Sequence, residues 1–137
     1  MMVRDIMTRN VRVASPGDDL QRAAQLMEKN DFGMLPVGEN DRLVGMLSDR
    51  DIAVRAVARG LSPEHKVREV MSTEIKYVYD DETVEDVARN MSDWQVRRLP
   101  VLNREKRLVG IVSLGDLALK TPKPASDALC SLSQHTH

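Results

Sequence analysis

The sequence predicts an α/β (α+β) fold made of two βαββα repeats that pack with pseudo-two-fold symmetry. Residues 3-57 align with residues 67-120 at an offset of 64 positions up to Val37 and Val101, and of 65 positions after one extra loop residue. Each copy contains the period of an amphipathic helix and short apolar runs between turn residues. Because a copy of roughly 55 residues is near the lower limit for independent stability, the two copies should share one body.

The repeat divides the chain of 137 residues into four parts. The tail is expected to be flexible, because Pro, Ser, Thr and His dominate there and no periodicity survives. We predict a first repeat at 1-60, a linker at 61-66, a second repeat at 67-120 and a flexible tail at 121-137.

Each copy begins with an alternating apolar pattern that predicts a first strand, at Val11 to Val13 and at Ile75 to Tyr79. Turn residues follow, and then a helix whose apolar residues recur at i, i+3, i+4 and i+7. This buried stripe comprises Leu20, Ala23, Ala24 and Met27 in the first copy and Val84, Val87, Ala88 and Met91 in the second.

A hairpin and a second helix should complete each copy. The first hairpin strand carries Leu-Pro-Val, whose proline suits a strand start or an edge because it cannot donate a ladder hydrogen bond. The second strand is a continuous apolar run, and the two should pair. The hairpins are expected at 35-37 with 43-47 and at 99-101 with 108-112, and the helices at 49-59 and 114-120.

Composition and charge argue against several classes of partner. Lys and Arg total 20 against 21 Asp and Glu, with the signs interspersed, so no basic face for nucleic acid is expected. No apolar run approaches the ~20 residues of a membrane span, and the N-terminus lacks the pattern of a signal peptide. A single cysteine, Cys130, cannot form a disulfide within one chain. We therefore expect a cytoplasmic protein.

The chemistry of the chain is expected where a strand leads directly into a helix, at Ser48 to Asp51 and at Ser113 to Asp116. Amide donors at a helix start favour a phosphate, a serine hydroxyl adds a donor, and a carboxylate can accept both vicinal hydroxyls of a ribose. The same spacing is also that of a capping box, in which serine and acidic residue cap the helix. Both roles can coexist.

The order of elements occurs twice in the chain, and each copy contains Leu-Pro-Val and Leu-Val-Gly-x-x-Ser-x-x-Asp. Over residues 3-120 this pattern resembles the CBS (cystathionine β-synthase type) domain pair, or Bateman module. The resemblance implies a regulatory module that binds an adenosine-containing ligand such as AMP, ATP, NAD or S-adenosylmethionine. It also implies a homodimer that passes its ligand state to a partner protein. Such pairs usually adjoin a channel or enzyme domain, whereas this one is expected to be free-standing.

In the family, each cleft combines the Ser-x-x-Asp turn of one copy with the first strand and the residues before Leu-Pro-Val of the other. Carried over by position, the first cleft gathers the basic residues Arg50, Lys76 and Arg97, whereas the second keeps Arg12, so the first should prefer the more phosphorylated ligand. The first cleft would comprise Ser48, Arg50, Asp51, Ile75, Lys76, Val96 and Arg97, and the second Ser113, Asp116, Val11, Arg12, Phe32 and Gly33.

The alternatives are an enzyme and an interaction module without a ligand. Against catalysis, the chain has no phosphate-binding glycine loop, no His-Glu-x-x-His and no core histidine beside a nucleophile. A dimeric protein-protein interaction module would use the apolar helix Ile52 to Val57 and its counterpart.

No metal is expected, since Cys130, His135 and His137 match no closed zinc site. Trp94 is expected to pack against a helix.

Overall fold

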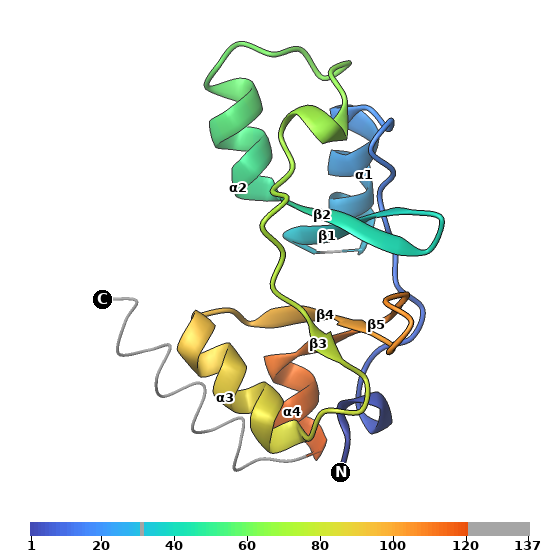
Figure 1. Cartoon of the computed structure of the whole chain (residues 1–137). Coiled ribbons are helices and arrows are strands. Elements are labelled where there is room, and N and C mark those ends of the chain that lie inside the picture. The colour runs from blue at the N-terminus through green and yellow to red at the C-terminus, as the bar shows by residue number, and fades with distance from the viewer. Residues whose placement is uncertain (31, 121–137) are drawn as a thin grey trace, which may run out of the picture. The chain divides into compact units, whose positions relative to one another are not determined.

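The structure is a computed structural model that describes residues 1-30 and 32-120 (Figure 1). The predicted tail at 121-137, with Cys130, His135 and His137, lies outside the described residues. The chain forms two compact units. One is the continuous unit, Arg12–Ile75, and the other is the discontinuous unit, Met1–Val11 together with the chain from Lys76 onward.

The continuous unit is a β-hairpin with two helices on one face (Figure 1). Strand β1 (Met34–Glu39) pairs antiparallel with β2 (Arg42–Ser48), which confirms the predicted hairpin. Helix α1 (Leu20–Asn30) buries Leu20, Ala23 and Met27, as the spacing predicts, but Ala24, predicted to belong to the same stripe, is exposed because it lies at the edge of the buried face. The second helix begins as α2 (Asp49–Asp51), continues as the π-helix η2 (Ile52–Val57) and ends two residues before the predicted Arg59.

The discontinuous unit has the same plan with one more strand (Figure 1). Its three-stranded sheet has the order β3-β4-β5, where β3 (Val78–Tyr79) is parallel to β4 (Arg98–Leu102) and β4 is antiparallel to β5 (Leu108–Ser113). Helices α3 (Val84–Trp94) and α4 (Leu114–Lys120) cover one face of the sheet. These are the predicted helices and the predicted second hairpin.

Each unit contains the opening segment of the other sequence repeat. The short 3-10 helix η1 (Val3–Asp5) belongs to the first repeat, but Val3, Ile6 and Met7 are buried in the core formed by β3 to α4. The corresponding 3-10 helix η3 (Val67–Glu69) opens the second repeat, yet Val67 and Val70 belong to the core of the continuous unit. The sequence repeat and the compact unit are therefore not the same piece of chain.

We call the opening segments Val3 to Thr8 and Val67 to Ser72 the exchanged segments. A two-way backbone bridge, in which two residues each donate an N–H to the other's carbonyl, fixes each exchanged segment to its sheet. In the continuous unit, Met46 and Ser72 exchange N–H···O bonds of 2.9 and 2.8 Å, and in the other unit Ile111 and Thr8 do the same at 2.9 and 2.8 Å. The hairpin neighbours of Met46 and Ile111 are Pro36 and Pro100. Because the polar backbone groups of Met46 and Ile111 point to the exchanged segment, a proline opposite them costs no hydrogen bond.

A glycine lets the exchanged segment approach this closely. A Cβ atom on Gly45 would lie 2.6 Å from Met71 Sδ and 3.0 Å from the carbonyl oxygen of Ser72. At Gly110, the matching position, it would lie 2.6 Å from Met7 Sδ and 2.9 Å from the carbonyl oxygen of Thr8. The recurrent glycine of Leu-Val-Gly is thus required by packing, because real Cβ contacts are never so short.

The first-strand prediction holds in one copy and fails in the other. Within the described residues, the second copy forms β3 at Val78–Tyr79, a shorter strand than the predicted Ile75 to Tyr79. The strand predicted at Val11 to Val13 is wrong: Ala14 alone makes a parallel bridge, to Val37. Its two bonds, Ala14 N–H to the Pro36 carbonyl and Gly38 N–H to the Ala14 carbonyl, are both 2.9 Å, and the turn at Ser15 to Asp18 ends the pairing.

A bidentate ion pair joins the β4-β5 loop to the turn that precedes α3. Arg104 donates from Nε and Nη2 to the two carboxylate oxygens of Asp81 at 2.9 and 2.8 Å, and its guanidinium lies 4.1 Å from the Tyr79 ring centroid. The Arg104 hydrogen bonds lower the pKa of Asp81.

None of the helices in the described part of the chain is long and apolar enough to cross a membrane.

The glycine contact gives a stability prediction. Gly45→Ala should lower the free energy of unfolding by about 1–3 kcal/mol, the usual cost of an added carbon in a filled core. Urea unfolding followed by circular dichroism measures this cost. Gly38→Ala in the same hairpin is the control, because its Cβ would meet ordinary contacts of 3.6 Å or more. Equal stability of the two variants would contradict the packing argument.

Candidate functional site

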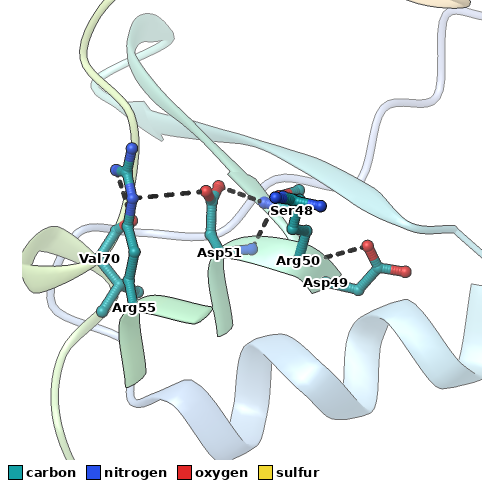
Figure 2. A network of polar contacts seen from close by, with 6 residues as sticks. All are labelled: Ser48, Asp49, Arg50, Asp51, Arg55 and Val70. Carbon is teal, nitrogen blue, oxygen red and sulfur yellow. Dashed lines mark hydrogen bonds and ion pairs between the residues drawn. The ribbon is translucent and has the colours of Figure 1, made fainter. Parts of the chain in front are cut away.

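The predicted Ser48–Asp51 turn forms a reciprocal pair of hydrogen bonds at the end of β2 (Figure 2). Asp51 N–H donates to Ser48 Oγ at 3.0 Å, and Ser48 N–H donates to Asp51 Oδ2 at 2.9 Å. Ser48 has extended backbone angles, so it ends the strand and caps the helix at once. This is the capping box that the spacing alone predicts.

The second repeat builds the same arrangement at the end of β5. Asp116 N–H donates to Ser113 Oγ at 3.1 Å, and Ser113 N–H donates to Asp116 Oδ2 at 2.8 Å. The capping role is therefore confirmed in both copies. Both side chains can still make further hydrogen bonds, because a carboxylate has about four lone-pair sites and a serine that accepts a bond can still donate its proton.

The amide donors at the start of α2 are already engaged. Asp49 N–H donates to the Gly33 carbonyl at 2.9 Å, Arg50 N–H to Asp49 Oδ1 at 2.7 Å, and Asp51 N–H to Ser48 Oγ. The expectation that these backbone amides are unpaired is therefore wrong at this turn, whereas a phosphate site there stays a prediction. A phosphate here would depend on side chains, the Ser48 hydroxyl and the exposed Arg50 guanidinium.

The residues before Leu-Pro-Val contact the helix start of their own unit. Gly33 accepts from Asp49, and a Cβ on Gly33 would lie 3.0 Å from Asp49 Oδ2, so the side chain of Asp49 lies over this glycine. In the other unit, the Arg97 carbonyl accepts from Leu114 N–H at 2.9 Å. Gly33 and Arg97 are thus held beside a Ser-x-x-Asp turn by backbone bonds.

The other predicted residues are distributed over the two units. Phe32 and Val96 are half-buried and pack against the cores of the continuous and discontinuous units, respectively. Lys76 is exposed and places its Nζ 5.7 Å from the ring centroid of Trp94, which packs against the core of the discontinuous unit. Val11 and Ile75 are half-buried, and Arg12 is exposed.

The structure brings some predicted members together and leaves others apart. The continuous unit holds Gly33, Ser48, Arg50 and Asp51 around one turn. The discontinuous unit holds Arg97, Ser113 and Asp116 around the other. Each predicted cleft draws on both units, so the complete clefts stay a prediction.

Sequence reasoning missed one residue of the first turn. Arg55 Nε lies 3.8 Å from Asp51 Oδ1, and Arg55 Nη1 donates to the Val70 carbonyl at 3.4 Å (Figure 2). The spacing of Asp51 and Arg55, four positions apart on a predicted helix, is the signal that would have found the ion pair. The contact to Val70 had no such signal, because it depends on the exchanged segment.

Comparison with known proteins assigns the family. The sequence profile of the CBS domain matches residues 3–57 and 67–121. The chain belongs to the CBS-domain family. This CBS chain is 43% identical over 138 residues to the CBS domain-containing protein YhcV of Bacillus subtilis, and the alignment covers 98% of each chain. It is 40% identical over 134 residues to Hypoxic response protein 1 of Mycobacterium tuberculosis, and that alignment covers 93% of each chain.

Solved structures of CBS proteins have the same fold. The crystal structure of Hypoxic Response Protein I with two coordinated zinc ions gives a TM-score of 0.80 at 40% identity, over 89% of this chain and 100% of that one. The CBS domain pair of MJ0100, in complex with 5′-methylthioadenosine and S-adenosyl-L-methionine, gives 0.75 at 28% identity, over 87% and 94%. CBSX2 in complex with AMP gives 0.76 at 27% identity, over 89% and 96%.

The two capping boxes predict a measurable stability cost. Ser48→Ala and Ser113→Ala should each reduce the free energy of unfolding by about 1 kcal/mol, because each removes the acceptor for the aspartate amide. Chemical unfolding in urea measures the change. Ser62→Ala, at an exposed position outside both boxes, should change the stability by less than about 0.5 kcal/mol. A cost no larger than that of the control would show that the hydroxyls do not cap.

Proposed function

We propose that this CBS chain is a non-catalytic regulatory module that binds an adenosine-containing ligand, with Asp51 and Asp116 as ribose acceptors. The observation that carries the proposal is the recurrence, in both repeats, of an aspartate whose Oδ2 is fixed by the serine amide. Fixing one oxygen orients the carboxylate before a ligand arrives, which lowers the entropic cost of binding. Vicinal hydroxyls then donate to a charged, pre-positioned acceptor.

Two similar structures support the class of ligand. CBSX2 is solved with AMP, and the MJ0100 pair with 5′-methylthioadenosine and S-adenosyl-L-methionine. These ligands share an adenosine moiety and differ in what the ribose carries. The shared part is the one that the aspartates would bind, so AMP, ATP, NAD and S-adenosylmethionine are all candidates.

The two turns differ in charge, which favours different ligands. Arg50 follows Asp49 in the first turn, whereas Gly115 occupies the matching position of the second. Lys76 and Arg97 would add positive charge to the first cleft, as the family pattern implies. We therefore propose that the cleft containing Asp51 takes the more highly phosphorylated ligand, because charged donors contribute the stronger hydrogen bonds to phosphate.

The proposal includes no chemical step. Ser48 Oγ accepts from a backbone amide, and His65, the histidine within the described residues, bonds through Nδ1 to Glu69 Oε1 at 3.0 Å. A serine nucleophile needs a neighbouring base, and these contacts supply none at Ser48. The ligand would act by changing how the module contacts a regulated protein, and no further cofactor is needed.

A ligand screen tests the proposal. Thermal unfolding with millimolar AMP, ADP, ATP, NAD, NADH or S-adenosylmethionine should show a higher Tm for at least one of them. A ligand at 100 times its Kd stabilises the folded state by about 2.7 kcal/mol. Asp51→Asn or Asp116→Asn should remove the shift and retain most of the capping, because asparagine keeps an acceptor oxygen while losing the charge.

The opposite results would be informative in different ways. A folded protein with an unchanged Tm in every ligand would contradict the ligand-binding proposal. Turnover of AMP or ATP that depends on Asp51 would contradict its non-catalytic character. A shift by ATP that survives in Asp51→Asn and disappears in Asp116→Asn would reverse the assignment of the phosphate-rich ligand.

The exposed apolar residues of the second helices favour a homodimer. Val54 and Val57 are 48% and 69% exposed on η2, and Leu119 is 83% exposed on α4. Val54 and Leu119 occupy matching positions of the two repeats. We propose that a second copy of the chain covers these side chains, since large apolar groups gain stability when they leave water.

The oligomeric state provides the test. Val57→Glu should shift the protein from dimer to monomer in analytical ultracentrifugation, because dimerisation would bury an unpaired charge. Val13→Glu is the control, since Val13 is also exposed, at 42%, and lies outside these helices. A wild-type protein that stays monomeric at high concentration, or a Val57→Glu variant that stays dimeric, would argue against this interface.

A further inference from the structure

Arg55 lies between the proposed ribose acceptor and the exchanged segment of the continuous unit (Figure 2). Its Nε faces Asp51 Oδ1 at 3.8 Å, and its Nη1 donates to the Val70 carbonyl at 3.4 Å. The Arg55 side chain is 44% exposed and that of Asp51 is 19% exposed. One guanidinium therefore contacts both a partly shielded carboxylate and a backbone carbonyl 15 residues farther along the chain.

The two oxygens of Asp51 have different neighbours. Oδ2 accepts from Ser48 N–H, while Oδ1 faces Arg55. A ligand hydroxyl that approaches the less engaged oxygen must therefore approach Arg55 as well. Binding there would exclude water from the Asp51–Arg55 pair, and a charge pair strengthens as the surrounding dielectric falls.

The other end of the Arg55 contact is firmly built into the fold. Val70 is 1% exposed, and its carbonyl lies at the end of η3, where a helix leaves acceptors unpaired. The next residue, Met71, fills the space left by Gly45, and Ser72 makes the two-way bridge to Met46. Movement of Arg55 would therefore act on the segment Val67 to Ser72, which leads to Ile75 at the end of the unit.

We propose that Arg55 is a positioning residue that couples occupancy of Asp51 to the order of the segment Val67 to Ser72. This inference rests on the proposed function, because it requires that Asp51 receives a ligand. Ligand binding tightens the Asp51–Arg55 pair, and Arg55 in turn holds the Val70 carbonyl more firmly. By reciprocity, a less ordered segment lowers the affinity for the ligand.

The two repeats carry different residues at the position of Arg55. The sequence places Lys120 at the position that matches Arg55. Lysine carries a single compact ammonium, whereas the planar guanidinium can present separate donors to a carboxylate and a carbonyl. Arg55→Lys therefore keeps the charge beside Asp51 and removes the fork that reaches both partners.

Hydrogen exchange by mass spectrometry on the full chain tests the coupling, with ATP at about 5 mM, a concentration like that of the ligand screen. ATP is used because the cleft that contains Asp51 is proposed to take the more highly phosphorylated ligand. The amides of Val70, Met71 and Ser72 are all hydrogen-bonded, so their exchange reports on this segment. ATP should slow their exchange in the wild type but not in Arg55→Met or Arg55→Lys. The ATP Kd should rise by up to about five-fold in Arg55→Met, the range of a partly exposed ion pair.

Arg59→Met is the matched control, because Arg59 follows the same helix and is exposed. It should behave as the wild type in both measurements. Without ATP, Arg55→Met should already exchange faster than Arg59→Met at Val70 to Ser72, and equal rates would overturn the contact itself. This measurement needs no ligand.

The two proposals fail in different ways. If ATP raises the Tm of the wild type but not of Asp51→Asn, and leaves exchange at Val70 to Ser72 unchanged, the coupling is wrong while the binding proposal stands. If ATP slows exchange equally in Arg55→Met and Arg59→Met, the segment responds without Arg55 and the inference is also wrong. If ATP neither raises the Tm nor changes exchange, both the coupling and ATP binding are contradicted.

Discussion

The two-way backbone bridges at Met46 and Ile111 are the constraint on which the other features depend. Each joins a strand to the opening segment of the other sequence repeat, through a pair of hydrogen bonds. The bridge explains the proline on the neighbouring strand, because the hydrogen-bonding groups of Met46 or Ile111 point away from that proline. It also explains the glycine that precedes Met46 or Ile111, because the glycine leaves room for a methionine sulfur of the exchanged segment. Two recurrent sequence motifs are thus explained by one contact in each unit.

The candidate site is an extension of the same strands. Residues Met46 and Ser48 are two positions apart on β2, so the strand that is fixed by Ser72 also delivers the serine that caps α2. The capping box then fixes Oδ2 of Asp51 and leaves Oδ1 toward Arg55. A structural role and a binding role share the same carboxylate, which explains why the sequence pattern alone could not separate them.

Local patterns in the sequence predicted the local structure well. The stripe from Leu20 to Met27 and the hairpin at Leu35 to Leu47 depend on residues close together in the chain, and both are present apart from the exposed Ala24. The strand at Val11 to Val13 failed because alternation shows which residues could line a strand and not whether a partner strand lies alongside. The exchange of opening segments was not predictable either, since aligning two repeats does not show which sheet each segment joins. The ion pair of Arg55 with Asp51 could have been predicted from their spacing, whereas the contact of Arg55 with Val70 could not.

The exchanged segments also bear on how such a chain can arise. One repeat by itself has a strand that needs an opening segment and an opening segment that fits another strand. Two single-repeat polypeptides could satisfy both needs only by trading these segments with each other. Fusion of two such genes would turn that trade into an intramolecular one, replacing dependence on protein concentration by a tether of fixed length.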